Sequence, residues 1–291
     1  MTTATNDVAE ARPSTWTLIR LCAGQERVLA VRSRWVQLFA AVFALLAIGV
    51  AGSGYILSGG HGVQDFARTA VSLVQLVLLV IPMTALTIGV LSLTLERGQA
   101  EMLFAQPVSR PVILLGKLLG LFEALAAAQA IGFGAAGMLI VNQAGEEGSS
   151  AFIGLVIASL ILTAIFLALA ALIAAGEVGR PRGRGLAIAL VLWFAMVVVY
   201  DLVALGTASM LPSKLASQLL IAAAVINPVD AVRTGTLLAI EGAAAFGSAS
   251  LAFLRASHGT AGAAILLIAS TIVWTVAPIS LALRRLARRD L

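Results

Sequence analysis

Six long apolar runs limit the folds that this chain can adopt. Each run is long enough for an α-helix to cross the roughly 30 Å hydrocarbon layer of a bilayer, which takes about 20 residues. Hydrophobic residues make up 60% of the chain and charged residues only 11%, whereas soluble domains have about 25% charged residues. The runs are continuous and do not alternate with polar residues, so we expect an all-α membrane protein and not an outer-membrane barrel. The expected spans are 36–57, 70–95, 111–142, 150–175, 185–206 and 261–283.

The basic residues predict how these spans are oriented. With both termini in the cytoplasm, most of the 19 Lys and Arg residues fall on the cytoplasmic side, in agreement with the positive-inside rule. The outer loops are then 58–69, 143–149 and a long segment, 207–260. Within it, 213–226 is expected to form an interfacial or re-entrant helix, because a seventh span would move the C-terminal arginines outside. The cytoplasmic basic residues are Arg12, Arg20, Arg27, Arg32, Arg34, Arg97, Arg110, Lys117, Arg180, Arg182, Arg184, Arg284, Arg285, Arg288 and Arg289.

The N-terminal segment, residues 1–35, precedes a single transmembrane domain over 36–291. An amphipathic interfacial helix is expected over 14–35, with its arginines directed toward anionic lipid. Two interpretations stay open: a basic anchor that orients the first span, or a lever that transmits force from a cytoplasmic partner. One face of this helix is expected to hold Trp16, Ile19, Cys22, Leu29 and Trp35, opposite Arg20, Arg27 and Arg34.

The cytoplasmic loop between the second and third spans, residues 96–110, has the composition of a docking element. Its centre has room for two helical turns before Pro107 ends the helix. Apolar side chains on a charged loop suit the groove of another protein, although a loop that packs on its own bundle would look similar. The candidate contact residues are Glu96, Glu101, Met102, Leu103, Phe104 and Arg110.

Ionisable residues inside the expected spans are candidates for a transport route or gate. Asp201, next to Tyr200, lies in the fifth span, where an ionised Asp costs about 2.5–3.5 kcal/mol on insertion scales. It either lines the route or is neutralised at the interface, for instance by Arg233. The same two interpretations apply to Glu123 in the third span.

The motif Asn227-Pro228-Val229-Asp230, followed by Arg233, also has two interpretations. It forms either a turn with a helix cap, in which Asp230 accepts from backbone N–H groups, or a contact with an extracytoplasmic partner.

Several of these segments resemble the ABC-2 type family of transporter permeases. The similar residues are Glu96, Gly98, Glu101-Met102-Leu103, Pro107-Val108-Ser109-Arg110 and Leu115-Gly116-Lys117. In that family a short helix in this loop docks on a separate ATP-binding subunit. The resemblance therefore implies a type V exporter-like transmembrane domain, two copies of the permease, two ATPase subunits, and docking on Glu96 to Ser109.

Other stretches resemble the NosY type within that family, the permease of the nitrous oxide reductase maturation transporter. They are Arg32 to Trp35, the Gly185-Leu186-Ala187…Trp193-Phe194…Asp201-Leu202-Val203 run, and the Asn227 to Arg233 motif. This resemblance implies a bacterial inner membrane, a periplasmic β-helix partner (NosD-like) on 207–260, and a role in supplying the copper–sulfur centre, with copper or a sulfur species as cargo.

The sequence contains no recognisable catalytic, nucleotide-binding or metal-binding motif. Gly116-Lys117 lacks the remainder of a phosphate-binding loop, so ATP and Mg²⁺ are expected on a partner subunit and no cofactor is expected here. Cys22, His61 and His258 are isolated and the methionines are not paired, so no metal site is expected. The net charge of +5 reflects membrane-flanking arginines and not nucleic-acid binding. The alternative functions are an ABC-2 exporter of a drug, lipid or peptide, and a membrane scaffold that transports nothing.

Overall fold

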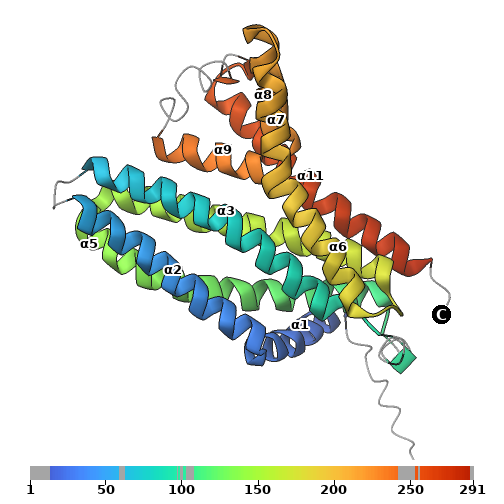
Figure 1. The fold of residues 1–291 in the computed structure, drawn as a ribbon. Helices are drawn as coiled ribbons and strands as arrows, with labels where there is room; N and C mark the ends of the chain where they lie inside the picture. Colours follow the sequence, from blue (N-terminus) through green and yellow to red (C-terminus); the bar gives the residue numbers. More distant parts are fainter. Residues whose placement is uncertain are drawn as a thin grey trace, which may run out of the picture.

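The computed structural model describes residues 14–58, 63–96, 98, 101–102, 108–241, 253–254 and 256–288, and in these ranges the only regular elements are helices. Figure 1 shows a bundle of long helices from which two neighbouring helices, labelled α7 and α8, project to one side. The helices of the bundle are α1 (Thr15–Arg32), α2 (Arg34–Ser58), α3 (Val63–Leu93) and α5 (Arg110–Glu177). They are followed by α6 (Arg182–Phe194), a π-helical segment η1 (Ala195–Val199), α7 (Tyr200–Ser209), α8 (Ser213–Ile226), α9 (Pro228–Glu241) and α11 (Thr260–Ala287).

The helical segment α5 holds two spans that fold back on each other. In a straight helix, residues 34 positions apart would lie about 51 Å apart at about 1.5 Å per residue. Instead, Gln129 Nε2 donates a hydrogen bond to Thr163 Oγ1 at 2.6 Å, and the rings of Phe133 and Phe152 meet edge to face at 5.8 Å. The chain therefore reverses between Met138 and Phe152. The loop expected over 143–149 is helical in the structure.

The core of the bundle lies between α2, α3 and the two halves of α5. Phe43, on α2, is fully buried and stacks on Phe39 at 5.6 Å. It also meets the edge of Phe133 at 5.1 Å, which in turn contacts Phe152. This chain of rings joins α2 to both halves of α5. The interhelical hydrogen bond of Gln129 crosses the same interface, in the role expected of a polar residue between membrane helices.

Among the described residues, six helical segments are long and apolar enough to cross a membrane, in agreement with the expected six-span all-α fold. They are Arg34–Gly52, Ser72–Leu93, Arg110–Met138, Phe152–Glu177, Arg182–Ser209 and Thr260–Ala287. The fourth is the central one, since 61% of its most apolar stretch is buried inside the chain, whereas the fifth has 6% and the sixth 17%. The fifth and sixth spans therefore expose most of their apolar surface.

The segment that follows the fifth span is helical and sharply bent. The α8 helix covers the stretch 213–226 that was expected to be interfacial or re-entrant, and α9 continues after a bend of 102°. Figure 1 shows α7 and α8 running side by side, with α9 lying alongside the first part of α3. As a pair, α8 and α9 have the length and composition of a broken span or a re-entrant loop.

The α1 helix packs along the first half of α5, with a different face from the one expected. Its N-cap is Ser14, whose Oγ accepts from Thr17 N at 3.2 Å. Ala23, Glu26 and Ala30 are buried, and the two alanines suit a face where two helices approach closely. The expected apolar face is divided in the structure. Ile19 and Cys22 lie beside Gly116, whereas Trp16, Leu29 and Trp35 are exposed.

Candidate functional site

The break between α8 and α9 is the first candidate site, and we call residues Ile226–Val229 the hinge. Asn227 has an extended backbone, the conformation that a following proline favours because its ring disfavours the helical one. Pro228 is buried and begins α9, where its missing N–H costs nothing. The motif therefore ends one helix and starts the next.

The hinge leaves the last carbonyls of α8 short of partners, although Ala223 O still accepts from Asn227 N at 3.1 Å. Side chains from two spans donate to these carbonyls. Tyr200 Oη donates to Ala223 O at 3.1 Å. Ser270 Oγ donates to Val225 O at 2.6 Å, and Trp274 Nε1 donates to Ile226 O at 2.8 Å. A helix end in apolar surroundings needs such partners because no water can replace them. The end of α8 is thus held by α7 and α11 together.

The side chain of Asn227 links the hinge to the fifth span. Its Oδ1 accepts from Val229 N at 3.0 Å and caps α9, while its Nδ2 donates to Met196 O at 2.8 Å. Met196 lies in the π-helical segment of the fifth span, where a change from i+4 to i+5 bonding leaves backbone groups to be satisfied and where functional residues often lie. The cap that we expected from Asp230 is therefore supplied by Asn227.

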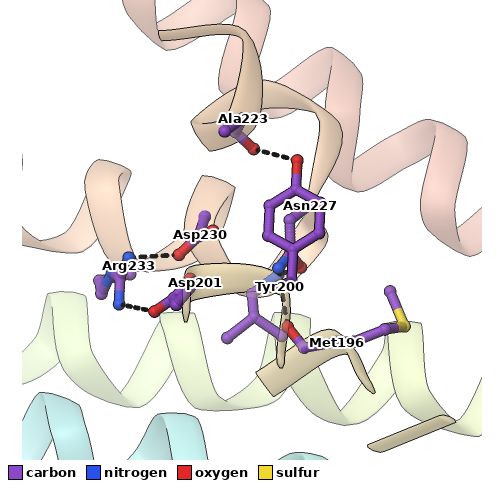
Figure 2. A network of polar contacts seen from close by, with 8 residues as sticks. Met196, Tyr200, Asp201, Ala223, Asn227, Asp230 and Arg233 are labelled. Atoms are coloured by element: carbon purple, nitrogen blue, oxygen red, sulfur yellow. Dashed lines mark hydrogen bonds and ion pairs between the residues drawn. The ribbon is translucent and has the colours of Figure 1, made fainter. Parts of the chain in front are cut away.

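Two carboxylates share one guanidinium beside the hinge (Figure 2). Arg233 Nη1 lies 2.7 Å from Asp201 Oδ2, and Arg233 Nη2 pairs with Asp230 Oδ1. Asp230 is only 4% exposed, so its charge depends on this partner. The structure thus pairs Asp201 with Arg233, one of the two interpretations of the sequence. We call Asp201, Asp230 and Arg233 the ion triad.

Removing the side chain of Asn227 should destabilise the protein measurably. Asn227→Ala loses both the cap of α9 and the bond to Met196, at a combined cost of about 1–3 kcal/mol. Asn227→Ser keeps a capping oxygen but cannot reach Met196, so it should fall between wild type and Ala. Thermal unfolding in detergent checks this order. Equal midpoints for Ser and Ala would mean that the cap contributes nothing.

The second candidate site is the end of the bundle that carries α1, where a buried ion pair joins α1 to α5. Glu26 is 5% exposed, and its Oε2 lies 3.1 Å from Lys117 Nζ. Its Oε1 accepts a hydrogen bond from Ser92 Oγ. A carboxylate this deeply buried is tolerated because both oxygens have partners.

Two glycines allow α1 to approach this closely. A Cβ atom at Gly116 would lie 2.9 Å from Ile19 O, and one at Gly120 would lie 2.4 Å from Ala23 O. Because these oxygens belong to the backbone, they cannot move aside without shifting α1. The spacing of the glycines is the small-xxx-small pattern of close membrane helix pairs. The Leu115-Gly116-Lys117 motif therefore provides both close packing and the cation for Glu26.

Glu123 belongs to this end of the bundle. Its Oε2 lies 2.9 Å from Arg27 Nη1 of α1, with both side chains partly exposed. The structure thus separates Glu123 from Asp201 and Tyr200, with which we grouped it as a candidate for the transport route. It forms a second link between α1 and α5.

The flanks of the 96–110 loop emerge at the same end. Glu96, Glu101 and Met102 are exposed, with Met102 at 77%. Arg110 is half-buried, and its Nη1 donates to Leu286 O of α11 at 3.2 Å. The candidates Leu103 and Phe104 lie outside the described residues. The loop is therefore anchored at one flank to α11 and presents polar and apolar side chains at the other.

Nearby, the turn between α5 and α6 is held to the end of α3. Glu177 is buried and pairs with Arg180 at 3.0 Å and with Arg184 at 3.1 Å, and Gly179 N donates to Leu95 O at 2.9 Å. In the described part of the chain, no group of three His, Cys, Asp or Glu side chains is placed to hold a metal ion.

Residues 22–291, which include both candidate sites, match the family described as ABC-2 family transporter protein. The chain belongs to the ABC-2 family. This ABC-2 permease is 31% identical over 246 residues to a protein of Pseudomonas aeruginosa described as "Probable ABC transporter permease protein NosY", a match that covers 82% of this chain and 87% of that protein. A protein of Stutzerimonas stutzeri with the same description is 33% identical over 218 residues, 73% of this chain and 78% of that protein. The chain is thus a multi-pass membrane subunit of an ABC transporter, similar to NosY.

Several residues of these sites in the ABC-2 permease were not predicted from the sequence, among them Glu26, Ser270 and Trp274. An acidic residue amid the apolar face of α1, such as Glu26, signals a buried partner. Ser270 and Trp274 lie inside an apolar span, where their donors show no pattern. Only the bend at the hinge reveals which carbonyls they satisfy.

Proposed function

We propose that this chain is the permease subunit of an ATP-driven transporter that serves maturation of the copper–sulfur centre of nitrous oxide reductase. The observation that carries the proposal is the similarity to two NosY proteins over most of the chain. The cargo is a sulfur species or copper. The protein resides in a bacterial inner membrane with both termini in the cytoplasm.

The charge distribution supports this orientation. The α1 end carries Arg20, Arg27, Arg34, Arg180, Arg182, Arg184, Arg284 and Arg285, and basic residues favour the cytoplasmic side. We therefore assign the α1 end to the cytoplasm and the α7–α8 turn to the periplasm, where a β-helix protein has Met210 and Lys214 as exposed contacts.

On this proposal the α1 end receives the ATPase. An ATPase that closes on nucleotide pushes on the loop that contains Glu101 and Met102. The Glu26–Lys117 and Arg27–Glu123 pairs move α1 and α5 as one unit. A second copy of the chain covers part of the exposed apolar surface of the fifth and sixth spans. Two permeases and two ATPases then complete the transporter.

Met102→Asp should release the ATPase, because it places a charge on an apolar contact that is 77% exposed in this chain and is buried on docking. Met210→Asp is the matched control. Met210 is 86% exposed, but it lies at the periplasmic end of the fifth span, away from the docking loop. Pull-down with a tagged permease measures the retained ATPase. We expect a loss of at least about tenfold for Met102→Asp and none for Met210→Asp. Equal retention by the two variants would contradict the docking assignment.

Deletion of the gene in its native host tests the cargo class. The proposal expects nitrous oxide reductase without its copper–sulfur centre. The wild-type gene should restore the centre, and the Met102→Asp gene should not.

Purification of the permease in mild detergent should bring down an ATPase and a periplasmic β-helix protein. An ATPase alone, with normal nitrous oxide reductase, would indicate an exporter of a drug, lipid or peptide. The absence of any ATPase would indicate a scaffold.

A further inference from the structure

The ion triad joins two helices through charges that do not balance. Asp201 lies on α7 and Asp230 on α9, and Figure 2 shows both carboxyl groups next to Arg233 of α9. Arg233 pairs with Asp201 through Nη1 and with Asp230 through Nη2. Two ionised carboxyl groups and one guanidinium would leave the triad with a net charge of one negative.

Burial and proximity make this excess negative charge unfavourable. Asp230 is buried, and the side chains of Asp201 and Arg233 are only 28% and 29% exposed, so water offsets little of the charge. The two carboxyl groups also lie within hydrogen-bonding reach of each other. Two carboxylates repel each other at such a distance, whereas a proton on one of them turns the contact into an O–H···O hydrogen bond.

The helices around the triad bring no compensating charge to it from the residues that the structure describes. Besides α7, the α9 helix neighbours α3, α5, α8 and α11. The span Ser72–Leu93 of α3 has no charged residue, and Lys214 is exposed at the other end of α8 from the hinge. Tyr200, beside Asp201, is a phenol that is uncharged near neutral pH and donates to Ala223 O. The described charged residues of α5 and α11 belong to the α1 end of the bundle and are Arg110, Lys117, Glu123, Glu177, Arg284, Arg285 and Arg288.

We propose that the ion triad binds one proton, which Asp201 and Asp230 share, and that this proton holds α9 to the fifth span. The proton enters at Asp201, the more exposed of the two carboxyl groups. It forms an O–H on one carboxyl group that donates to the other, and the triad becomes neutral. Its release restores the repulsion between α7 and α9 beside the hinge. This inference does not depend on an ATPase, a cargo or the proposed function.

The pH dependence of unfolding in detergent tests the proposal. An Asp in an unfolded chain is ionised above about pH 4, so the folded protein holds one proton more than the unfolded chain. The unfolding constant should therefore rise with pH, by up to about tenfold per pH unit over the range in which the folded protein keeps this proton. The thermal midpoint of wild type should fall accordingly as the pH is raised.

Asp230→Asn should remove this contribution to the pH dependence, because its amide N–H can donate to Asp201 at every pH. Its midpoint should stay close to that of wild type at low pH. Glu123→Gln is the control and should keep the wild-type slope, since it replaces a carboxyl group at the other end of the bundle, where Glu123 pairs with Arg27. The wild-type slope in Asp230→Asn, or a large loss of stability at low pH, would overturn the proposal.

Infrared spectroscopy detects the proton without a variant of the buried Asp230. The spectrum of wild type at neutral pH should show the C=O stretch of a protonated carboxyl group that is missing in Asp201→Asn, where Asp230 alone remains to pair with Arg233. The absence of this band from the difference spectrum would overturn the proposal.

Exchange of choline for sodium separates a proton from a metal cation. At constant ionic strength and at a pH above neutral, the exchange should leave the thermal midpoint of wild type unchanged. A rise with sodium that is absent in Asp230→Asn would assign the excess negative charge to a metal cation and overturn the proposal of a bound proton.

Discussion

Arg233→Met is expected to be among the most destabilising single substitutions in this protein. It removes the only cation of the ion triad and leaves Asp201 and the buried Asp230 facing each other. Breaking a buried ion pair by removing one partner costs about 3–5 kcal/mol. The unfolding midpoint in detergent should therefore fall well below that of Lys214→Met, in which an exposed basic side chain of the neighbouring α8 is replaced in the same way.

A triple variant separates the charge from the packing. Asp201→Asn, Asp230→Asn and Arg233→Met together remove all three charges while keeping similar volumes, so most of the lost stability should return. If the triple variant unfolds as early as Arg233→Met, the charges of the triad are not the cause. A triple variant that is stable but inactive in the host would place the triad in the transport cycle.

Gly120→Val is expected to detach α1 from the bundle. Its Cβ would lie 2.4 Å from Ala23 O and 2.9 Å from Arg27 N, and both atoms belong to the backbone of α1. Overpacking of this kind costs about 1–3 kcal/mol, which corresponds to a roughly fivefold to 150-fold larger population of the opened state. The single cysteine of the chain, Cys22, lies on the detached face and reports the opening.

Alkylation of Cys22 by a maleimide measures the effect. The rate should rise by the same factor as the opened population, and it should stay unchanged in Gly134→Val, because Gly134 lies on the same helix with open space around it. An unchanged rate in Gly120→Val would contradict the close packing of α1 on α5.

The spans and their number follow from the sequence because apolar length is a local property. Two residues of the ion triad were also recognisable, since an ionised side chain in an apolar run requires a partner, and Arg233 was named as one for Asp201. What the sequence did not reveal is which groups meet across the fold. Glu123 and Asp201 look equivalent in sequence, yet they lie at separate sites with different arginines.

The cap of α9 illustrates the same limit. Asn227 and Asp230 are both good capping residues, and composition favours neither. The 102° bend decides between them, because it directs Asn227 toward Val229 and Met196 and leaves Asp230 to Arg233. The Asn227-Pro228 pair encodes a break locally, but the direction in which α9 then turns depends on its packing against α3 and α5.

The shared anchoring of the α8 end has a mechanical consequence. If α8 moved with α7 and away from α11, the carbonyls of Val225 and Ile226 would lose their donors Ser270 and Trp274, and each unsatisfied group in apolar surroundings costs several kcal/mol (about 2–7). A separation of the helices that breaks these hydrogen bonds while the carbonyls stay in apolar surroundings is therefore the most unfavourable one. The helices α7, α8 and α11 should therefore tilt together as one rigid unit. A conformational change that extends across the membrane then has to occur at the contact between this unit and the bundle.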